Sequence, residues 1–412
     1  MTITNSAYHS LADVPRVRAR ASVARMVFER AVGQVPVRVS YPDGRRLGPA
    51  APGIPELRIV RPPAFFARLG RDAKIGFGEA YMAGDWVAAP ETDLGDLLTP
   101  FARRLATLVP APLQRLRAFV ERRVPSDQEN NRHGARRNIA AHYDLGNEMF
   151  AAFLDSTMSY SCALFDEQDA AESESVALER AQFRKIDAML DLARVRAGSR
   201  VLEIGCGWGA LATRAAARGA HVTAITLSQE QAREARARAS AARELVGVQL
   251  RDYRDVTGAF DAIVSVEMLE AVGERYWPVF FAQVDRLLAP GGTIAVQTIT
   301  MAHERMLATR HHYSWIQKYI FPGGIIPSLR AIDDALAGTA LRVVRNRELR
   351  PHYARTLRTW RQRFIASWPQ TRTQGLTEEF RRMWEFYLAY CEAGFAGGYL
   401  GVSQLQMRRE SA

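Results

Sequence analysis

The sequence predicts an α/β protein with a doubly wound, mostly parallel sheet, preceded by a smaller α+β domain. From residue 138 onward, apolar strand-like runs alternate with stretches of helical periodicity, a pattern typical of parallel sheets with helices on both faces. A glycine-rich turn closes the first of these strands. The chain has 412 residues, which is more than one hydrophobic core usually serves, so two domains are expected.

The alternation can be followed along the chain. A helix is expected near 174–194, where one face collects Phe183, Ile186, Leu190 and Ala193. Strands are expected at 200–204, 221–227, 247–252, 260–266 and 293–299. Helical stretches follow the first, second and fourth of these strands, so all five are expected to join one sheet.

The front of the chain has a different character. Pro and Gly interrupt short β-like runs at 35–40 and 57–60, and a helix is expected from 101 to 123. A polar and basic linker follows at 124–137. The sequence therefore predicts an N-terminal domain over 1–123 and a second domain over 138–412.

The composition excludes several classes of protein. Hydrophobic residues make up 48% of the chain and charged residues 24%, a soluble balance. No run approaches the roughly 20 apolar residues that span a bilayer, and the N-terminus lacks the apolar core of a signal peptide. Three cysteines, at positions 162, 206 and 391, form neither a disulfide framework nor a zinc cluster, so a cytoplasmic location and no metal are expected.

The basic charge is concentrated at the front. The net charge is +11, and residues 1–137 hold 22 Lys and Arg against 13 Asp and Glu, whereas the remainder holds 33 against 31. Coding bias explains the preference for arginine over lysine, but it does not explain why the excess of basic residues lies in the first third of the chain. We therefore expect residues 1–123 to dock on lipid, at an anionic inner membrane surface. Nucleic acid is the competing partner.

The glycine-rich turn predicts a binding site. Gly205, Gly207 and Gly209 directly follow the strand at 200–204, where glycine lets the backbone turn tightly and approach a ligand. A dinucleotide site would need an acidic residue about 20 positions later, but that stretch reads Ile225, Thr226, Leu227.

Acidic residues stand elsewhere around this turn. Glu203 precedes the glycines, and Asp252 ends the third strand, where an acid can meet an adenine or a ribose. Together with Ala210 in place of a third phosphate-binding glycine, these features favour S-adenosylmethionine, which has no phosphate, over NAD. A flavodoxin-like fold without a cofactor is the alternative.

Five ordered motifs resemble the cyclopropane-fatty-acyl-phospholipid synthases and the related mycolic-acid methyltransferases. They are HYDLGNEMF (142–150), MSYSCALF (158–165), VLEIGCGWG (201–209), DYRD (252–255) and KYIFPGG (318–324). In the front domain, GEAYMAGDW (78–86) is similar to the N-terminal domain of the phospholipid-acting branch. The shorter mycolate enzymes lack that domain, so the resemblance favours the phospholipid branch.

The resemblance implies a Rossmann-like class I methyltransferase fold and a reaction. A one-carbon unit from S-adenosylmethionine would be added to the cis double bond of an unsaturated phospholipid acyl chain, and the resulting carbocation would lose a proton and close a cyclopropane ring. Bicarbonate would be the base. Its implied ligands are Cys162, Glu270, Tyr353 and the backbone of Ile299, with Gln297 at the position where a histidine is usual.

The resemblance also implies a cofactor pocket. Its residues would be Tyr160, Ser161, Gly205, Gly207, Thr226, Leu227, Gln231 and Asp252, to which we add the neighbouring Glu203 and Tyr253. Since water would capture a carbocation, such a site must be dry. Aromatic faces can stabilise the cation, and the candidates are Tyr160, Phe165, Trp315, Tyr319 and Tyr353.

Two departures from the family pattern leave the product open. The chain reads EAVG at 270–273 where members commonly read EHVG, and Gln297 can donate a hydrogen bond but cannot carry charge. Proton loss by another route would give a methylene- or methyl-branched chain. Glu267, one helical turn before Glu270, competes with it for the same role.

Two other functions compete with lipid modification. A nucleic-acid methyltransferase would fit the basic front, but the sequence lacks a basic–aromatic RNA-binding signature and an Asn/Asp-Pro-Pro-Tyr motif, so no nucleic-acid partner is expected. A small-molecule methyltransferase would not need the front domain. A homodimer, the acyl position and the head-group preference stay open.

Overall fold

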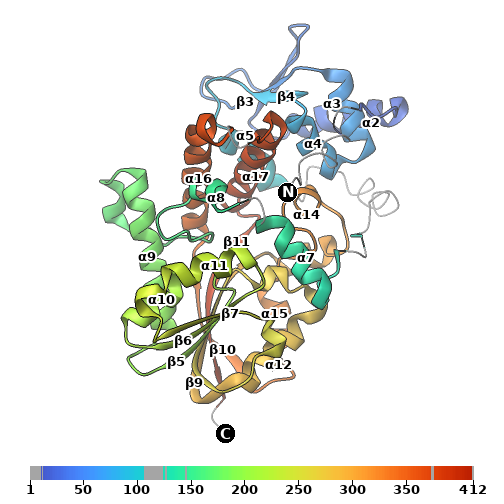
Figure 1. The fold of residues 1–412 in the computed structure, drawn as a ribbon. Helices are drawn as coiled ribbons and strands as arrows, with labels where there is room; N and C mark the ends of the chain where they lie inside the picture. The colour runs from blue at the N-terminus through green and yellow to red at the C-terminus, as the bar shows by residue number, and fades with distance from the viewer. Residues whose placement is uncertain are drawn as a thin grey trace. The chain divides into compact units, whose positions relative to one another are not determined.

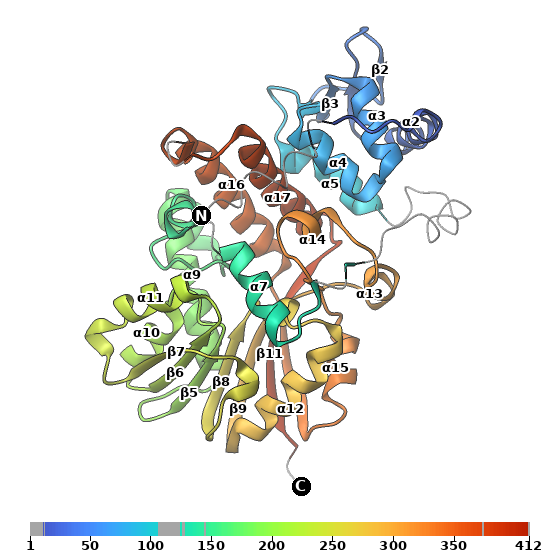
Figure 2. The same ribbon diagram turned by 45° about the vertical axis from the view of Figure 1, so that its right-hand side comes forward.

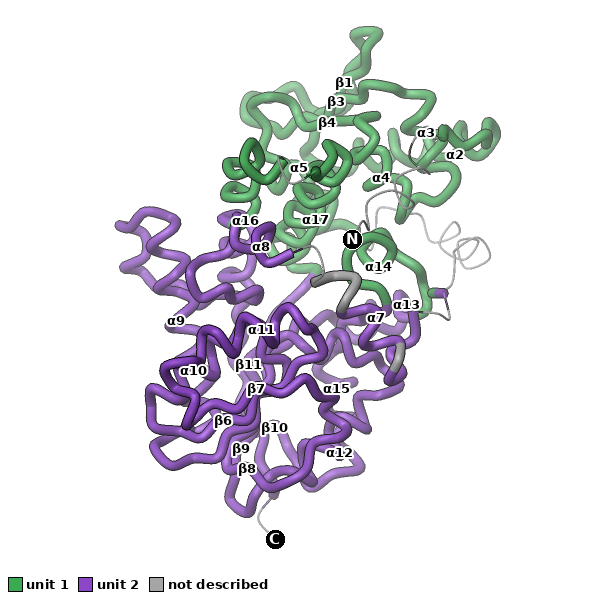
Figure 3. The backbone as a smooth tube through the Cα atoms, viewed as in Figure 1, with its two compact units in different colours: residues 1–124, 311–322, 360–399 green, residues 125–310, 323–359, 400–412 purple. Residues whose placement is uncertain are grey.

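A computed structural model describes residues 11, 13–105, 124–125, 128–143, 146–372 and 375–410. The chain forms two compact units (Figure 3). The first comprises residues 1–124, 311–322 and 360–399, and the second comprises residues 125–310, 323–359 and 400–412. The boundaries at 123 and 138 stay a prediction, and the compact units add two later segments to the front part of the chain.

A seven-stranded sheet forms the centre of the second unit (Figure 1). Its order is β10-β11-β9-β8-β5-β6-β7. The strands are β5 (Arg200–Ile204), β6 (His221–Thr226), β7 (Val246–Leu250), β8 (Phe260–Val266), β9 (Leu288–Thr300), β10 (Leu341–Glu348) and β11 (Gly401–Arg409). Strands β5 to β9 pair in parallel, and β11 runs antiparallel to both β9 and β10. The predicted mostly parallel α/β sheet is confirmed.

Helices cover both faces of this sheet (Figure 2). Helices α9 (Glu174–Leu192), α10 (Ala210–Ala217) and α11 (Gln229–Arg238) pack on one face, and α12 (Trp277–Leu287) and α15 (Leu329–Leu336) pack on the other. The unit also contains α7 (Arg132–Tyr143), α8 (Asn147–Ala151), α13 (His303–Thr309) and the first part of α16 (Arg350–Thr371). Alternate residues of one strand face opposite layers. Val201 of β5 packs with α9, α10 and α11, whereas Leu202 and Ile204 pack with α12 and α15.

One predicted helix face differs in detail. Ile186, Leu190 and Ala193 are buried as expected, but Phe183 is 36% exposed, and the Arg214 guanidinium lies 5.5 Å from the centre of its ring. The buried face of α9 is rotated away from Phe183 because the helix also covers the segment 158–165. It therefore buries polar residues that the apolar pattern did not include.

The first unit mixes short strands with helices, as an α+β domain does. Its sheet has the order β2-β1-β3-β4. The elements are α2 (Arg18–Val32), β1 (Arg38–Ser40), β2 (Arg46–Leu47), β3 (Glu56–Ile59), α3 (Pro62–Arg71), α4 (Ala73–Met82), β4 (Trp86–Ala88), α5 (Leu94–Arg104), α14 (Trp315–Tyr319), the end of α16 and α17 (Glu378–Ala396). Trp315 packs on Phe386, and Tyr319 donates a hydrogen bond to Glu79.

Two expectations concern helices. The helix expected over 101–123 is described only at its start, where α5 ends at Arg104, since residues 106–123 lie outside the described residues. In the part of the chain that the structure describes, no helix has both the length and the apolar character to cross a bilayer.

Candidate active site

The glycine turn after β5 is shaped to leave space. Gly207 has φ +50°, and a Cβ built there would meet no atom within 4 Å. Gly209 has φ +86°, and its missing side chain lets α11 approach, because a Cβ would lie 3.0 Å from the Cβ of Ala235. The backbone at Gly207 is therefore open to a ligand, while the turn behind it is closely packed.

An acid without a complete set of partners lies just before this turn. Glu203 is 5% exposed, and its buried Oε2 has no hydrogen-bond partner among the described residues. Burial raises the pKa of Glu203 to about 8, although nearby Lys185 acts in the opposite direction. An open backbone and an unsatisfied carboxylate oxygen fit S-adenosylmethionine, which brings an ammonium group and ribose hydroxyls as donors.

The other expected cofactor residues lie on neighbouring strands. Thr226 ends β6 and donates to Gln231 Oε1 (2.9 Å), and Leu227 follows Thr226. Asp252 follows β7, and its two carboxylate oxygens accept from Arg254 at 2.8 and 2.7 Å. Tyr253 packs its ring on Phe280. The cofactor roles of these residues stay predictions.

Helix α9 holds the segment that carries Tyr160, Ser161 and Cys162. Gln182 donates to the Ser161 carbonyl (2.9 Å) and the buried Lys185 donates to Ser161 Oγ (2.8 Å). Tyr160 packs edge-on against Phe150, with ring centres 5.3 Å apart. Because the oxygen of Ser161 accepts from Lys185, its hydroxyl hydrogen remains available to donate elsewhere.

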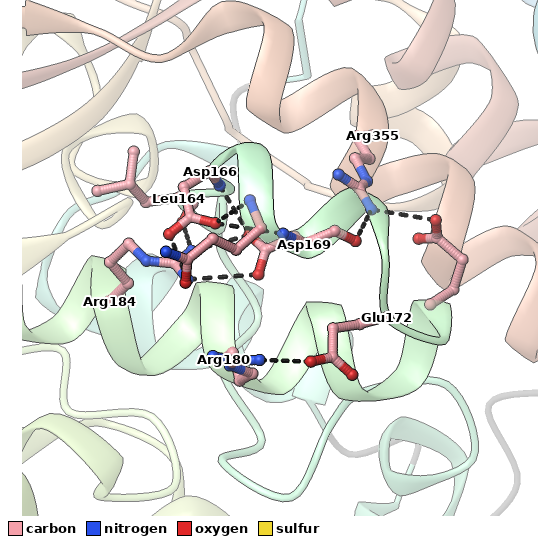
Figure 4. A network of polar contacts seen from close by, with 9 residues as sticks. Leu164, Asp166, Asp169, Glu172, Arg180, Arg184 and Arg355 are labelled. Atoms are coloured by element: carbon pink, nitrogen blue, oxygen red, sulfur yellow. Dashed lines mark hydrogen bonds and ion pairs between the residues drawn. The ribbon is translucent and has the colours of Figure 1, made fainter.

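A second network fixes the far end of this segment (Figure 4). Arg184 donates to the Leu164 carbonyl (2.7 Å) and to Asp169 (2.9 Å), and Arg355 donates to the Asp169 carbonyl (3.2 Å). The Arg355 guanidinium also lies 4.3 Å from the centre of the Phe165 ring. Helix α16, which carries Tyr353, is thereby tied to the segment that carries Cys162.

Glu267 stands at the centre of the predicted catalytic residues. Its Oε1 accepts from the backbone N–H of Cys162 (2.8 Å) and from Gln297 Nε2 (2.8 Å), and its Oε2 accepts from the Tyr353 hydroxyl (2.5 Å). Glu267 has φ +49°, a conformation that costs a non-glycine residue about 1 kcal/mol or more. Three hydrogen bonds hold the carboxylate in this position.

The Gln297 amide is oriented by a strand that the sequence did not indicate. Gln404 of β11 donates to Gln297 Oε1 (3.0 Å), so the Gln297 NH₂ group points to Glu267. Gln297 is fully buried, and it also donates to the Cys162 carbonyl (3.3 Å). Its amide therefore presents a fixed donor to the carboxylate.

Glu270 forms the second carboxylate of the site. Its Oε1 accepts from Thr298 Oγ1 (2.9 Å) and the Ile299 N–H (2.5 Å), and its buried Oε2 has no partner among the described residues. Burial, and then the charge of Glu267, raises the pKa of Glu270 to about 7. A carboxylate so placed changes protonation near neutral pH.

Cys162 takes part in the site through its backbone N–H, which donates to Glu267, more than through its sulfur. The side chain is fully buried and its Sγ lies 3.2 Å from the Ala163 carbonyl. Burial raises the pKa of the thiol well above its usual value, so the sulfur is neutral. The structure thus brings Cys162, Glu270, Gln297, Ile299 and Tyr353 together, around two carboxylates instead of one.

Three residues of this site were missed by sequence reasoning: Lys185, Thr298 and Gln404. A lone lysine on an amphipathic helix ordinarily indicates a solvated face, and Gln404 lies far along the chain from every motif. Thr298 offered a weak signal, because it lies between Gln297 and Ile299 in the strand already singled out.

The sheet, the open glycine turn and the acid beside it define an S-adenosylmethionine-dependent methyltransferase. The family model described as mycolic acid cyclopropane synthetase matches residues 130–405. The chain belongs to this family.

The chain is similar to several lipid-modifying enzymes. It is 50% identical to tuberculostearic acid methyltransferase UfaA1 of Mycobacterium tuberculosis, over 99% of this chain and 96% of that protein. It is 34% identical to the cyclopropane-fatty-acyl-phospholipid synthase of Escherichia coli K12, over 85% of this chain and 87% of that protein.

Solved structures show the same fold. The cyclopropane synthase MmaA2 from Mycobacterium tuberculosis matches with a TM-score of 0.58 and 32% identity, over 66% of this chain and 97% of that one. The mycolic acid cyclopropane synthase CmaA1, solved with SAH and CTAB, matches with a TM-score of 0.58 and 31% identity, over 66% and 98%. The predicted Rossmann-like methyltransferase fold and the dependence on S-adenosylmethionine are therefore confirmed.

Glu270→Gln is expected to lower turnover on the order of 10²-fold and to leave the affinity for S-adenosylmethionine almost unchanged. Glu270 contacts Thr298 and Ile299 and lies beside Glu267, not at the glycine turn. Titration calorimetry and a turnover assay separate the two effects, with Glu230→Gln on α11 as the control. A variant that loses affinity as much as turnover would contradict this placement.

Proposed function

We propose that this protein transfers a methyl group from S-adenosylmethionine to the cis double bond of a phospholipid acyl chain and forms a methylene- or methyl-branched product. The observation that carries the proposal is the carboxylate of Glu267, which accepts hydrogen bonds from three of the residues that the family resemblance places around bicarbonate: Cys162, Gln297 and Tyr353. The 50% identity with a tuberculostearic acid methyltransferase supports a branched product.

The cofactor would supply the methyl group from its sulfonium, with the carbon–sulfur bond breaking and its electron pair remaining on sulfur. The electron pair of the alkene forms the new carbon–carbon bond, and the neighbouring chain carbon is left with the positive charge. For a methylene product, a hydrogen moves with its electron pair from the methylated carbon to that neighbour. Glu267 then takes a proton from the added methyl group, and the released electron pair forms the exocyclic double bond. Loss of a proton from the adjacent chain carbon would instead leave a methyl branch and an alkene in the chain.

Glu267 suits the role of base. It is an anion held by three donors, and burial raises its pKa above that of an ordinary glutamate, so it has a greater affinity for a proton. A fixed carboxylate cannot diffuse away and is too constrained by Cys162, Gln297 and Tyr353 to move onto the cation. Water is excluded by the packing around the fully buried Gln297 and Thr298.

The charges nearby argue against an additional bicarbonate ion. Glu267 and Glu270 already place two carboxylates at the site, and Lys185 is the nearby cation that acts on the pKa of Glu267. A third anion would be repelled by both carboxylates in a poorly solvated space. The bound carboxylate of Glu267 therefore replaces the soluble base in this proposal.

Cyclopropane formation with a bicarbonate base is the second candidate. It is supported by the family to which the chain belongs and by the 34% identity with a cyclopropane-fatty-acyl-phospholipid synthase. In that reaction the electron pair released from the methyl group closes a ring onto the cationic carbon.

The product identifies the reaction. The purified protein is incubated with monounsaturated phosphatidylglycerol and methyl-labelled S-adenosylmethionine, and the lipid is analysed by mass spectrometry before and after hydrogenation that reduces alkenes and spares rings. We expect the labelled chain to take up hydrogen. A labelled chain that resists hydrogenation would establish the cyclopropane, and the absence of label in lipid would refute both candidates.

A further inference from the structure

We propose that the exposed face of α2 docks this protein on the surface of an anionic phospholipid bilayer. The inference rests on the proposed function in one respect, that the substrate is a phospholipid in a membrane. The surface itself is defined by helix α2 of the first unit.

One side of α2 is fixed in the protein. Phe28 and Val32 are buried, and the Phe28 ring packs edge-on against Phe65 and Phe66, with centres 5.1 and 5.9 Å away. These contacts prevent the helix from turning about its axis. Among the described residues, the opposite side of α2 is exposed at Val23 and Met26.

That opposite side has an apolar centre. Val23 and Met26 are three residues apart, so they lie on the same face, and they are 51% and 63% exposed. Met26 has the highest exposure of any large apolar side chain among the described residues. These two neighbours form a small exposed apolar patch.

Arginines flank this centre and have no acidic partners. On a helical projection, Arg18 and Arg20 fall on opposite sides of the line through Val23 and Met26. Arg30 projects onto the same face as Val23 and Met26, one turn further along the helix. None of these three, nor the preceding Arg16, forms an ion pair with a described residue. The helix's single acid, Glu29, pairs with Arg25 and Arg45, so it does not offset the exposed charge.

An apolar centre with an arginine rim matches the chemistry of an anionic lipid surface. Phosphate groups pair with the arginines, while the region just below them takes up valine and methionine side chains. Nucleic acid would satisfy the arginines but would leave Val23 and Met26 without a matching surface. A neutral bilayer would accept the apolar side chains but would not attract the arginines.

The test uses the full-length protein and vesicle flotation. One set of vesicles contains phosphatidylglycerol mixed with phosphatidylcholine, and the other contains phosphatidylcholine alone. We expect binding to the first set and its weakening by salt. The double variant Arg18→Gln/Arg20→Gln should bind about 25-fold more weakly, because each arginine near such a surface contributes about fivefold. Val23→Asn/Met26→Gln should also bind more weakly, with the salt dependence retained.

Matched controls separate this face from a general effect of charge or polarity. Arg243→Gln/Arg251→Gln removes two exposed arginines of the second unit, and Val344→Asn removes an exposed apolar side chain. Both should bind as the unchanged protein does. Full binding by the α2 variants, equal losses in the controls, or duplex DNA as the preferred ligand would overturn the proposal. Since all substituted side chains are exposed, the melting temperature should stay the same.

Activity in two lipid formats distinguishes the docking proposal from the proposed function. With substrate dispersed in detergent micelles, the α2 variants should turn over like the unchanged protein, and with vesicles they should be slower. If the unchanged protein methylates lipid in neither format but still binds anionic vesicles through α2, the proposed function fails and the docking surface stands. If it methylates lipid in both formats without binding vesicles through α2, the docking surface fails alone.

Discussion

Glu267→Gln is expected to lose turnover by about 10²–10⁴-fold, the usual contribution of a general base, and to bind S-adenosylmethionine as the unchanged protein does. The amide keeps the size of the side chain but cannot accept the proton. Rates with saturating lipid and cofactor, together with calorimetric titration of the cofactor, measure the two effects. Full activity of this variant would show that the proton leaves to another group.

Glu267→Gly gives the sharper test of the same carboxylate. Glycine adopts φ +49° without strain, so the backbone after β8 should be retained. The donors on Cys162, Gln297 and Tyr353 would then lack an acceptor and be free to bind a small anion. We expect the glycine variant to be nearly inactive alone and to recover part of its turnover with added bicarbonate, whereas Glu267→Gln should not recover, because its amide still fills the space.

The pH dependence follows from the same groups. The reaction needs Glu267 as the carboxylate, and burial raises its pKa, so turnover should fall on acidification at a higher pH than the roughly 4.3 of a free glutamate. Burial and the charge of Glu267 raise the pKa of Glu270 to about 7, so this second carboxyl changes protonation near neutral pH. Unchanged protein that needs added bicarbonate for full activity would contradict the role given to Glu267.

Gly207→Val is expected to abolish measurable binding of S-adenosylmethionine while the protein stays folded. The valine side chain would fill the open space beside the backbone, and at φ +50° it would also strain the turn. Titration calorimetry should show no heat of binding. An unchanged affinity would mean that the cofactor lies elsewhere.

A matched control isolates the effect of occupying that space. Gly198 also has positive φ (+78°) and open surroundings, but it lies before β5, away from the glycine turn. Gly198→Val should therefore carry a similar backbone strain and keep the cofactor affinity. A loss of binding in both variants would point to general destabilisation, which thermal unfolding would reveal.

Sequence reasoning located the central strands well, because turns and charged residues mark their ends. The expected strand 260–266 coincides with β8, and 200–204 coincides with β5. Sequence reasoning did not predict where β10 and β11 begin and end. Strand β10 is an edge strand with mostly exposed residues, and β11 buries polar residues such as Gln404 between its neighbours. Strand β11 forms because it pairs with β9, and this long-range pairing leaves no apolar pattern in the local sequence.

The site was predicted in outline and differs at its centre. The structure brings together Cys162, Glu270, Gln297, Ile299 and Tyr353, which the motifs indicated, and their catalytic roles stay predictions. Glu267 was considered only as a competitor of Glu270. The position of the Glu267 side chain depends on a left-handed backbone conformation, and this conformation cannot be predicted from a glutamate in the sequence. Lys185 was missed for a related reason, since its burial comes from the packing of 158–165 on α9.

The left-handed backbone at Glu267 has an evolutionary consequence. Codons for glutamate and glycine differ by one nucleotide, and glycine is the residue that occupies this conformation most easily. Under the proposed mechanism, a single point mutation would separate an enzyme that carries its own proton acceptor from one that recruits dissolved bicarbonate. Under the same mechanism, one substitution at this position would make the methylation of lipid depend on the supply of inorganic carbon.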